Sequence, residues 1–215
     1  MSVKARGLPD CGTGLVAWDT GAIVNASHDT TLVNRSRQDF TGVENVWLFG
    51  YGSLIYKADF PYLEKRSATI LGWSRRFWQG SHDHRGTPDH PGRVVTLVPE
   101  TDAACIGMAY RIAPTTFEQL DFREKNGYLR HIVTLAFPDG TCAEGLVYIA
   151  ERDNAAWLGH AGEAEIGRHI AGSSGPSGRN SDYVFRLAQA LRELGADDPH
   201  VFTVEAELRK LAAAG

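Results

Sequence analysis

The sequence predicts a mixed α+β protein, built on a mainly antiparallel β-sheet that is closed or strongly curved, like a barrel, with flanking helices. Two observations predict this fold class. Segments rich in β-branched and aromatic residues follow one another from residue 46 to residue 150, and helical segments come after them. The chain has 215 residues, which suits one domain that buries roughly 70% of its unfolded surface.

The first 44 residues differ in composition from the rest of the chain. They are rich in Asp, Asn, Thr, Ser and Gly, and their apolar stretches are brief, at 15–18 and 22–24. Terminal segments of this composition are often poorly ordered. We therefore expect residues 1–44 to be a partly disordered extension that either packs on the body or lies loose, and 45–215 to be the folded domain.

The strands are expected where Val, Ile, Leu, Phe, Tyr and Trp cluster. Pro138-Asp139-Gly140 is a turn signal between the last two clusters, so these two strands should form an antiparallel hairpin. The expected strands are 46–50, 68–79, 93–98, 104–112, 129–137 and 142–150.

A short helix is expected at 115–124, after Pro114, with Thr115 or Thr116 as its N-cap. Three further helices should close the chain, and a glycine- and serine-rich flexible loop at 172–178 precedes the second of them. The three helices are expected at 162–171, 181–194 and 199–213.

Composition and charge indicate a soluble globular protein. Hydrophobic residues make up 43% and charged residues 22% of the chain, the formal net charge is −4, and the pI is near 6.1. No basic surplus is present to hold a phosphate backbone, so nucleic acid is not expected as a partner. No uninterrupted apolar stretch approaches the roughly 18 residues of a membrane span, so no membrane partner is expected either.

The cysteines favour a reducing compartment. Cys11, Cys105 and Cys142 are odd in number and lack C-x-x-C spacing. The last two lie in apolar, strand-like runs, where free cysteine behaves as a small hydrophobic residue. The apolar stretch that follows Lys4 and Arg6 is too short for the core of a signal peptide. We therefore expect a cytoplasmic protein.

The first candidate for function is the turn after the strand at 46–50. Gly50 and Gly52 let the backbone turn sharply and approach a ligand closely. Consecutive N–H groups in such a turn suit a carboxylate or a developing oxyanion. A dinucleotide-binding loop would need glycine at Ile55, and Ser53 lacks the flanking glycines of a nucleophile elbow. The loop is therefore expected to bind rather than attack, although this stretch alone favours an ordinary turn.

The second candidate is Glu124. On a helix over 115–124, Phe117, Leu120 and Glu124 share one face, whereas Glu118 and Arg123 point elsewhere. A carboxylate in line with an apolar stripe is partly desolvated, which raises its pKa toward the range useful for a general base. The alternative is a surface ion pair with a neighbouring arginine or lysine, and spacing alone favours that alternative modestly.

Two further segments carry polar candidates. Along the strand 73–80, alternation places Arg75 on one face and Arg76 on the other. An arginine between large apolar side chains suits a substrate carboxylate, and an exposed edge strand is an equally supported alternative. His82, His84 and His90, with Asp83 and Asp89, invite comparison with a metal site. Their spacing departs from a metallo-hydrolase motif, and prolines and glycines interrupt the segment, so no metal site is predicted.

Four motifs, in their order and spacing, together resemble the ChaC-type γ-glutamylcyclotransferases. The resemblance covers roughly residues 46–195 and includes GPSGRNSDYVFRL at 175–187, while residues 1–44 lie outside it. Asn126-Gly127-Tyr128 stands where the family often has Gly-Gly-Tyr, a mild departure because Asn tolerates a left-handed turn. The four motifs are FGYGSLIY at 49–56, SRRFWQG at 74–80, PGRVVTL at 91–97 and REKNGY at 123–128.

The resemblance implies a barrel-like fold and a cofactor-free, metal-free reaction on glutathione. The α-amine of the γ-glutamyl group attacks its own γ-carbonyl, giving 5-oxoproline and cysteinylglycine. Glu124 occupies the position of the family's catalytic base. The loop Gly50, Tyr51, Gly52, Ser53, Leu54 and Ile55 matches the family's substrate-binding loop. Substrate binding is also expected, from motif membership alone, for Arg76, Arg93, Tyr128 and Tyr183.

Three other functions remain open at this stage. The RRFWQG and PGRVVTL segments favour the glutathione-specific branch, but the same ring closure on other γ-glutamyl amino acids or γ-glutamylamines is the nearest alternative. A catalytically silent γ-glutamyl-binding protein comes next, and the presence of Glu124 weighs against it. A metal hydrolase built on the histidines of 82–90 is a distant third. The sequence leaves the oligomeric state open.

Overall fold

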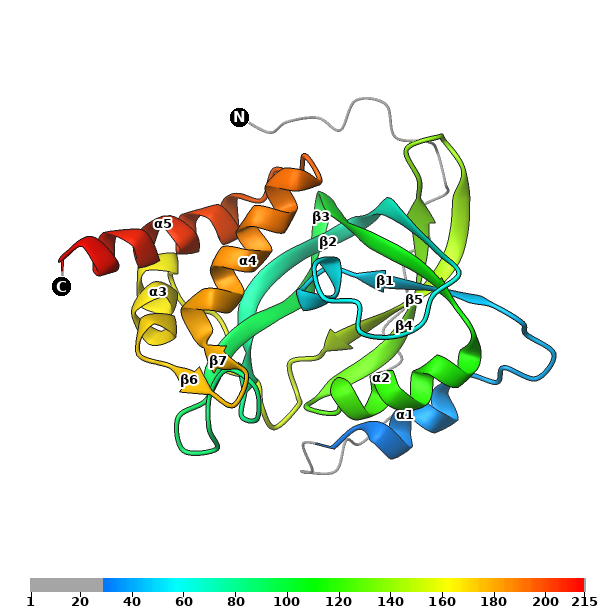
Figure 1. Ribbon diagram of the computed structural model, residues 1–215, viewed down its shortest axis with the longest axis horizontal. Helices are drawn as coiled ribbons and strands as arrows, with labels where there is room; N and C mark the ends of the chain where they lie inside the picture. Colours follow the sequence, from blue (N-terminus) through cyan, green and yellow to red (C-terminus); the bar gives the residue numbers. More distant parts are fainter. Residues whose placement is uncertain (1–28, 215) are drawn as a thin grey trace.

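A closed five-stranded β-barrel forms the centre of the protein in the computed structural model, which describes residues 29–214 (Figure 1). The strand order is β1-β3-β2-β4-β5. β5 closes the barrel by pairing in parallel with β1, and every other neighbouring pair is antiparallel. The predicted closed, mainly antiparallel sheet is confirmed. The strands are β1 Val46–Gly50, β2 Glu64–Ser81, β3 Gly92–Ile112, β4 Tyr128–Ala136 and β5 Cys142–Ala150.

The predicted strands 93–98 and 104–112 are one continuous strand, β3, which pairs with β2 along almost its whole length. The polar residues between them form an irregular segment in which Asp102 has a φ of 64°. Opposite this segment, the register of β2 shifts between Leu71 and Trp73. Such an irregularity bends a long hairpin without ending it, which is why polar composition wrongly indicated a break.

The predicted hairpin of β4 and β5 is confirmed. Its turn contains Gly140 at a φ of 84°, and the Asp139 carboxylate accepts a hydrogen bond from the backbone N–H of Thr141 at 3.0 Å. Cys142 begins β5, is exposed and is disulfide-bonded, so the prediction of a free thiol inside the strand is wrong for this residue. Cys105 in β3 is buried and free, and burial raises its pKa to about 11.

The three predicted helices that close the chain are present, and they gather on one side of the barrel (Figure 1). α3 packs against α5, and both neighbour α4. Where a flexible loop was expected between α3 and α4, two short strands pair as a small hairpin. The bounds are α3 Glu163–Ala171, β6 Ser174–Gly175, β7 Gly178–Arg179, α4 Asn180–Glu193 and α5 Pro199–Ala214.

Two short helices, α1 and α2, lie side by side on the other side of the barrel (Figure 1). The predicted helix at 115–124 is a 3₁₀ turn followed by a shorter α-helix that ends at Arg123. The 3₁₀ turns are η1 Ser53–Ile55 and η2 Pro114–Thr116, and the helices are α1 Thr31–Arg37 and α2 Phe117–Arg123.

The segment before the barrel packs on the body from Asp29 onward. The Thr30 hydroxyl donates to the carbonyl of Tyr128 at 2.8 Å, and its backbone N–H donates to the carbonyl of Lys125 at 2.9 Å. Asn34 is fully buried and bonds the backbone of Tyr128 and Arg130, at 2.9 Å each. Cys11 and the apolar stretches of 15–18 and 22–24 lie outside the described residues.

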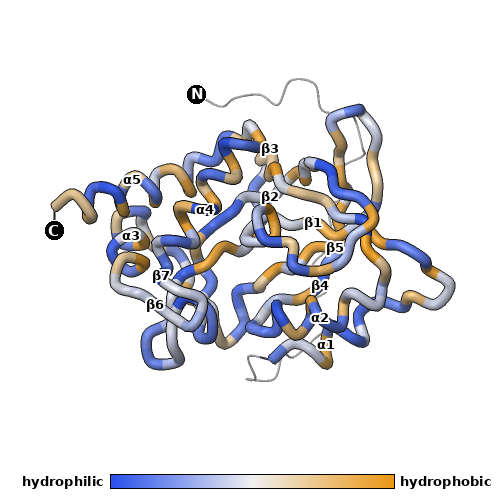
Figure 2. The backbone as a smooth tube through the Cα atoms, viewed as in Figure 1, coloured by the Kyte–Doolittle hydropathy of each residue, from blue (hydrophilic) through white to orange (hydrophobic). Residues whose placement is uncertain are grey.

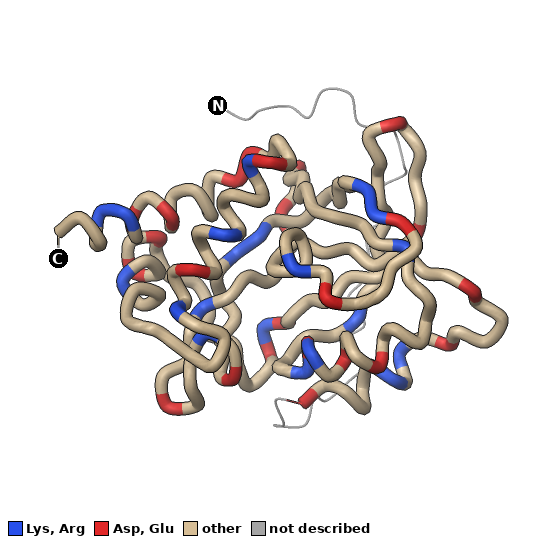
Figure 3. The backbone as a smooth tube through the Cα atoms, viewed as in Figure 1, with Lys and Arg blue, Asp and Glu red and all other residues tan. Residues whose placement is uncertain are grey.

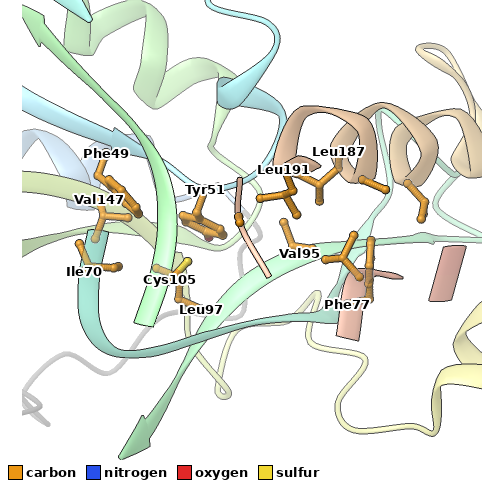
Figure 4. Close-up of a cluster of buried hydrophobic side chains, with 14 of the residues drawn as sticks. Phe49, Tyr51, Ile70, Phe77, Val95, Leu97, Cys105, Val147, Leu187 and Leu191 are labelled. Carbon is orange, nitrogen blue, oxygen red and sulfur yellow. The ribbon is translucent and has the colours of Figure 1, made fainter. Parts of the chain in front are cut away.

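The main core fills the barrel and the space between the barrel and α4. In Figure 2 the strands are predominantly hydrophobic, whereas the loop that joins β2 to β3 is hydrophilic. Acidic and basic residues are interspersed along the backbone (Figure 3). Among residues 29–214, no helix has the length and apolar character needed to cross a membrane. Figure 4 shows part of this core: Phe49, Tyr51, Ile70, Phe77, Val95, Leu97, Cys105, Val147, Leu187 and Leu191.

Candidate active site

A cavity of about 310 Å³ opens at the end of β1, between the barrel, α2 and the start of α4. This volume lies at the lower end of the range, roughly 300–1,000 Å³, of small-molecule sites. The cavity brings together most of the side chains and backbone groups predicted for the site. The predicted residues that line it are Gly50, Tyr51, Gly52, Ser53, Leu54, Glu124, Tyr128 and Tyr183.

The loop after β1 presents backbone donors to this cavity. The 3₁₀ turn closes when the N–H of Ile55 donates to the carbonyl of Gly52 at 3.0 Å. Within the described structure, the N–H groups of Gly52 and Ser53 have no acceptor. Unpaired donors on a loop that lines a cavity are suited to a carboxylate or an oxyanion.

Both glycines of the loop are required by close contacts. A Cβ at Gly50 would lie 2.5 Å from the Cβ of Leu54, and a Cβ at Gly52 would lie 3.0 Å from the Tyr183 hydroxyl. Ile55, predicted to bind substrate, does not line the cavity, because the 3₁₀ turn directs it toward the core.

Arg75 holds the loop after β1 in place. Its guanidinium is buried, donates to the carbonyl of Tyr51 at 2.6 Å and to that of Ile106 at 2.6 Å, and pairs with Asp198. The strand alternation expected for residues 73–80 is therefore present, with Arg75 on the inward face. A buried, fully bonded guanidinium holds its partners in one geometry, so Arg75 sets the position of the Tyr51 carbonyl.

Arg76 and Arg93 do not line the cavity, contrary to the prediction. Arg76 is on the opposite face of β2 from Arg75, and it pairs with Glu100 at 2.5 Å. Arg93 is buried, and one of its terminal nitrogens donates to the carbonyls of Phe77 at 2.9 Å and Gly159 at 3.0 Å. Both arginines were expected from motif membership, which does not distinguish residues that support a site from residues that face it.

Glu124 lies directly after the last residue of α2. Its backbone N–H donates to the carbonyl of Leu120 at 2.8 Å, and its side chain is 18% exposed inside the cavity. Phe117 and Leu120, the predicted partners on its face, are buried. Burial raises the pKa of the Glu124 carboxyl above the ordinary value, and the positive charge of Arg123 opposes this shift.

Arg123 also reaches the cavity, which corrects the prediction that it points away. Its Nε lies 3.2 Å from Oε1 of Glu124, another nitrogen donates to the Ser53 hydroxyl at 2.9 Å, and a third contact is an ion pair with Asp59. The helical spacing fails here because Glu124 has left the helix. The predicted alternative, a pair with a neighbouring arginine, is thus formed, but within the cavity rather than on the surface.

Buried tyrosines form the inner wall. Tyr51 donates to the carbonyl of Tyr148 at 2.8 Å, Tyr128 donates to the carbonyl of Val95 at 2.8 Å, and Tyr148 donates to the Asp121 carboxylate at 2.5 Å. Burial raises the pKa of each tyrosine hydroxyl. These phenols therefore stay neutral and shape the cavity without adding charge.

Comparison with known proteins identifies the family. A model of the ChaC-like protein family matches residues 46–211. The chain belongs to the ChaC-like family. The resemblance stated above is therefore confirmed, and the matched segment extends beyond its predicted end at residue 195 to include most of α5.

This chain matches curated relatives over most of their length. The glutathione-specific gamma-glutamylcyclotransferase 1 of Danio rerio is 43% identical over 178 residues, which are 78% of this chain and 90% of that protein. The gamma-glutamylcyclotransferase 2-3 of Arabidopsis thaliana is 40% identical, over 77% of this chain and 89% of the relative.

A solved structure shows the same fold. The crystal structure of a yeast gamma-glutamyl cyclotransferase specific to glutathione superposes with a TM-score of 0.73 at 32% identity, covering 78% of this chain and 96% of the yeast chain. The predicted barrel-like cyclotransferase fold is confirmed for this ChaC-like chain.

Other cavity residues of this ChaC-like protein were missed by sequence reasoning. The loop between β2 and β3 supplies Asp83, His84 and Arg85, and α4 supplies Arg186. His84 is joined to the β6–β7 hairpin, since its carbonyl accepts from the backbone N–H of Ser177 at 2.9 Å. Among residues 29–214, no group of His, Cys, Asp or Glu is arranged to hold a metal. Only the fold brings these distant segments together, and the local signal at Asp83 and His84 suggested a metal site rather than this cavity.

Proposed function

We propose that this protein is a glutathione-specific γ-glutamylcyclotransferase that releases 5-oxoproline and cysteinylglycine. The proposal rests mainly on the observation that a candidate base and candidate oxyanion donors lie in the same cavity. A partly buried carboxylate with a raised pKa, Glu124, shares the cavity with the unpaired N–H groups of Gly52 and Ser53. The names of the relatives support glutathione as the substrate.

The proposed mechanism uses Glu124 as base and then as acid. Glu124 takes a proton from the substrate α-amine, whose nitrogen attacks the γ-carbonyl carbon and forms the five-membered ring. The carbon–nitrogen bond to cysteine then breaks, and Glu124 returns the proton to the departing nitrogen. No water is consumed, and the reaction needs no metal or organic cofactor. The attack is intramolecular, so the cavity mainly has to fold the γ-glutamyl arm into the attacking conformation.

The loop would stabilise the charge that develops during ring closure. As the γ-carbonyl becomes tetrahedral, its oxygen gains negative charge, which the N–H groups of Gly52 and Ser53 are suited to accept. Arg123 holds the Ser53 hydroxyl and Glu124 together, so the donors and the base keep a common geometry. Tyr128 and Tyr183 bound the space in which the γ-glutamyl arm folds.

Two further parts of the proposal concern organisation and location. Residues 45–215 contain all the proposed site residues, so this range is proposed as the catalytic domain. The substrate supports a cytoplasmic location, because glutathione belongs to the system that keeps cytosolic thiols reduced.

The proposal is tested by incubating the purified protein with reduced glutathione and following products by mass spectrometry. Equal amounts of 5-oxoproline and cysteinylglycine are expected. A well-folded protein that forms neither product from glutathione, but forms 5-oxoproline from another γ-glutamyl amino acid or a γ-glutamylamine, would contradict the specificity. No product from any γ-glutamyl compound would favour a silent binding protein.

The pH at which kcat/KM falls on acidification should lie above the pKa of an ordinary glutamate, which is about 4.3. This fall is the acid limb of the pH profile. The base works only when deprotonated, and burial raises the pKa of Glu124, so kcat/KM should fall as the pH drops through this raised pKa. Arg123→Met removes the positive charge that lowers this pKa and should move the limb to higher pH. The profile of kcat/KM against pH measures the shift, with Arg35→Met on the exposed part of α1 as control. A limb that stays in place or moves to lower pH would contradict the assignment.

A further inference from the structure

One of the residues that line the cavity has a buried hydroxyl without a partner among the described residues. The phenol oxygen of Tyr56 is inaccessible to solvent, and within the described part of the chain no group forms a hydrogen bond with it. Tyr56 follows the 3₁₀ turn of the binding loop and lines the cavity. Buried polar groups are nearly always paired, so this hydroxyl marks a position where a ligand atom would supply the missing acceptor or donor.

Three arginines that line the same cavity act electrostatically on this hydroxyl. Burial raises the pKa of Tyr56, and the charges of Arg85, Arg186 and Arg123 oppose the shift. Arg123 is already committed to Glu124 and Asp59. Arg85 donates to the carbonyl of Arg179 at 3.0 Å and lies over the Tyr183 ring, with its Cζ 5.9 Å from the ring centre.

Arg85 and Arg186 lack the partner that would neutralise them. In the region from residue 29 to residue 214, neither guanidinium forms an ion pair with a carboxylate. The carboxylates that line the cavity are Glu124, which pairs with Arg123, and Asp83, which lies 3.9 Å from Nε2 of His84. Two cations beside an unpaired hydroxyl, facing the same cavity, form a site of the kind that binds a carboxylate.

We propose that Tyr56, Arg85 and Arg186 form a subsite for the carboxylate at the far end of the substrate, which in glutathione is the carboxylate of glycine. The inference rests on the proposed function and extends it to the part of the substrate that does not react. Arg186 lies one turn of α4 after Tyr183, whose hydroxyl is next to Gly52. Tyr56, Arg85 and Arg186 line the same cavity as Glu124 and Gly52, so both ends of one substrate would lie within it.

The subsite explains which γ-glutamyl compounds the cavity prefers. A γ-glutamylamine carries no carboxylate beyond the scissile bond, and it would leave Arg85, Arg186 and the Tyr56 hydroxyl unpaired. Leaving charged or polar groups of a site unpaired costs more affinity than losing an apolar contact. Tyr56, Arg85 and Arg186 would therefore select for substrates with a terminal carboxylate, although they do not contact the reacting atoms.

The test compares glutathione with its glycine monoethyl ester, which has the same length but no terminal charge. For the wild-type protein, kcat/KM should be roughly tenfold or more higher for glutathione than for the ester. Arg186→Gln should lower kcat/KM for glutathione by a similar factor and leave the ester almost unaffected, so that the ratio approaches one. Tyr56→Phe should move the ratio in the same direction. Arg168→Gln, on α3 and outside the cavity, is the matched control.

The outcomes separate this inference from the proposed function. If the wild-type protein released no 5-oxoproline from glutathione or its ester, the function itself would fail. If the wild-type protein were active and Arg186→Gln lowered kcat/KM equally for both substrates, Arg186 would instead serve the γ-glutamyl end or the fold. That result, or an unchanged ratio, would overturn the subsite.

Discussion

Glu124→Gln should lower the turnover of glutathione by roughly 10²–10⁴-fold and leave the fold intact. The amide keeps the size of the side chain and removes the proton acceptor. Glu124 is bonded to the protein through Arg123, and the amide oxygen still accepts from that guanidinium. Rates of 5-oxoproline formation measure the loss, and thermal unfolding shows whether the fold is retained.

The matched control for this variant is Glu118→Gln. Glu118 is on α2, the helix that Glu124 directly follows, its side chain is 83% exposed, and its contact is a weak pair with Arg35 at 3.9 Å. Its replacement should leave turnover within about twofold, because exposed ion pairs contribute little. Near wild-type turnover of Glu124→Gln would show that another group removes the amine proton, and the proposed mechanism would then be wrong.

Arg75→Met should destabilise the protein by about 3–5 kcal/mol, as expected when one partner of a buried ion pair is removed. The variant leaves Asp198, which is largely buried, without its cation, and it leaves the carbonyls of Tyr51 and Ile106 without donors. The unfolding free energy from urea titration measures the effect. The remaining folded protein should also bind glutathione more weakly, because the binding loop loses its support.

Arg76→Met is the control on the adjacent residue. The Arg76 side chain is 23% exposed and its partner Glu100 is 50% exposed, so solvent screens the pair and the change should cost no more than about 1 kcal/mol. Equal destabilisation by the two variants would mean that Arg75 does not have a special structural role. A restored KM in Arg75→Lys would show that a cation alone is enough to hold the loop.

The parts of the site that sequence reasoning predicted are those encoded locally. The glycine loop follows its strand directly. Glu124 was marked by its spacing from Phe117 and Leu120, and the family resemblance then assigned it as the base, although it lies just outside the helix. Strand alternation separated Arg75 from Arg76 but did not show which face was inward. That choice depends on Asp198, which is 123 residues away.

The residues that were missed are separated from the loop by long stretches of sequence. Arg186 shares a cavity with the loop only because α4 packs against the barrel, and His84 reaches it only because the long β2–β3 hairpin extends past the barrel. Because residues 99–103 are polar, β3 was predicted as two separate strands, whereas the strand bends there and continues. No periodicity within a short window carries this information.

The α1 segment shows that a family boundary and a folding boundary need not coincide. The family match starts at residue 46, yet Thr30 and Asn34 bind the backbone at Lys125, Tyr128 and Arg130, which immediately follow Glu124. A protein shortened to begin at residue 45 would keep every matched motif but lose the hydrogen bonds of Thr30 and Asn34. The position of Glu124 thus depends partly on residues that lie outside the matched family segment.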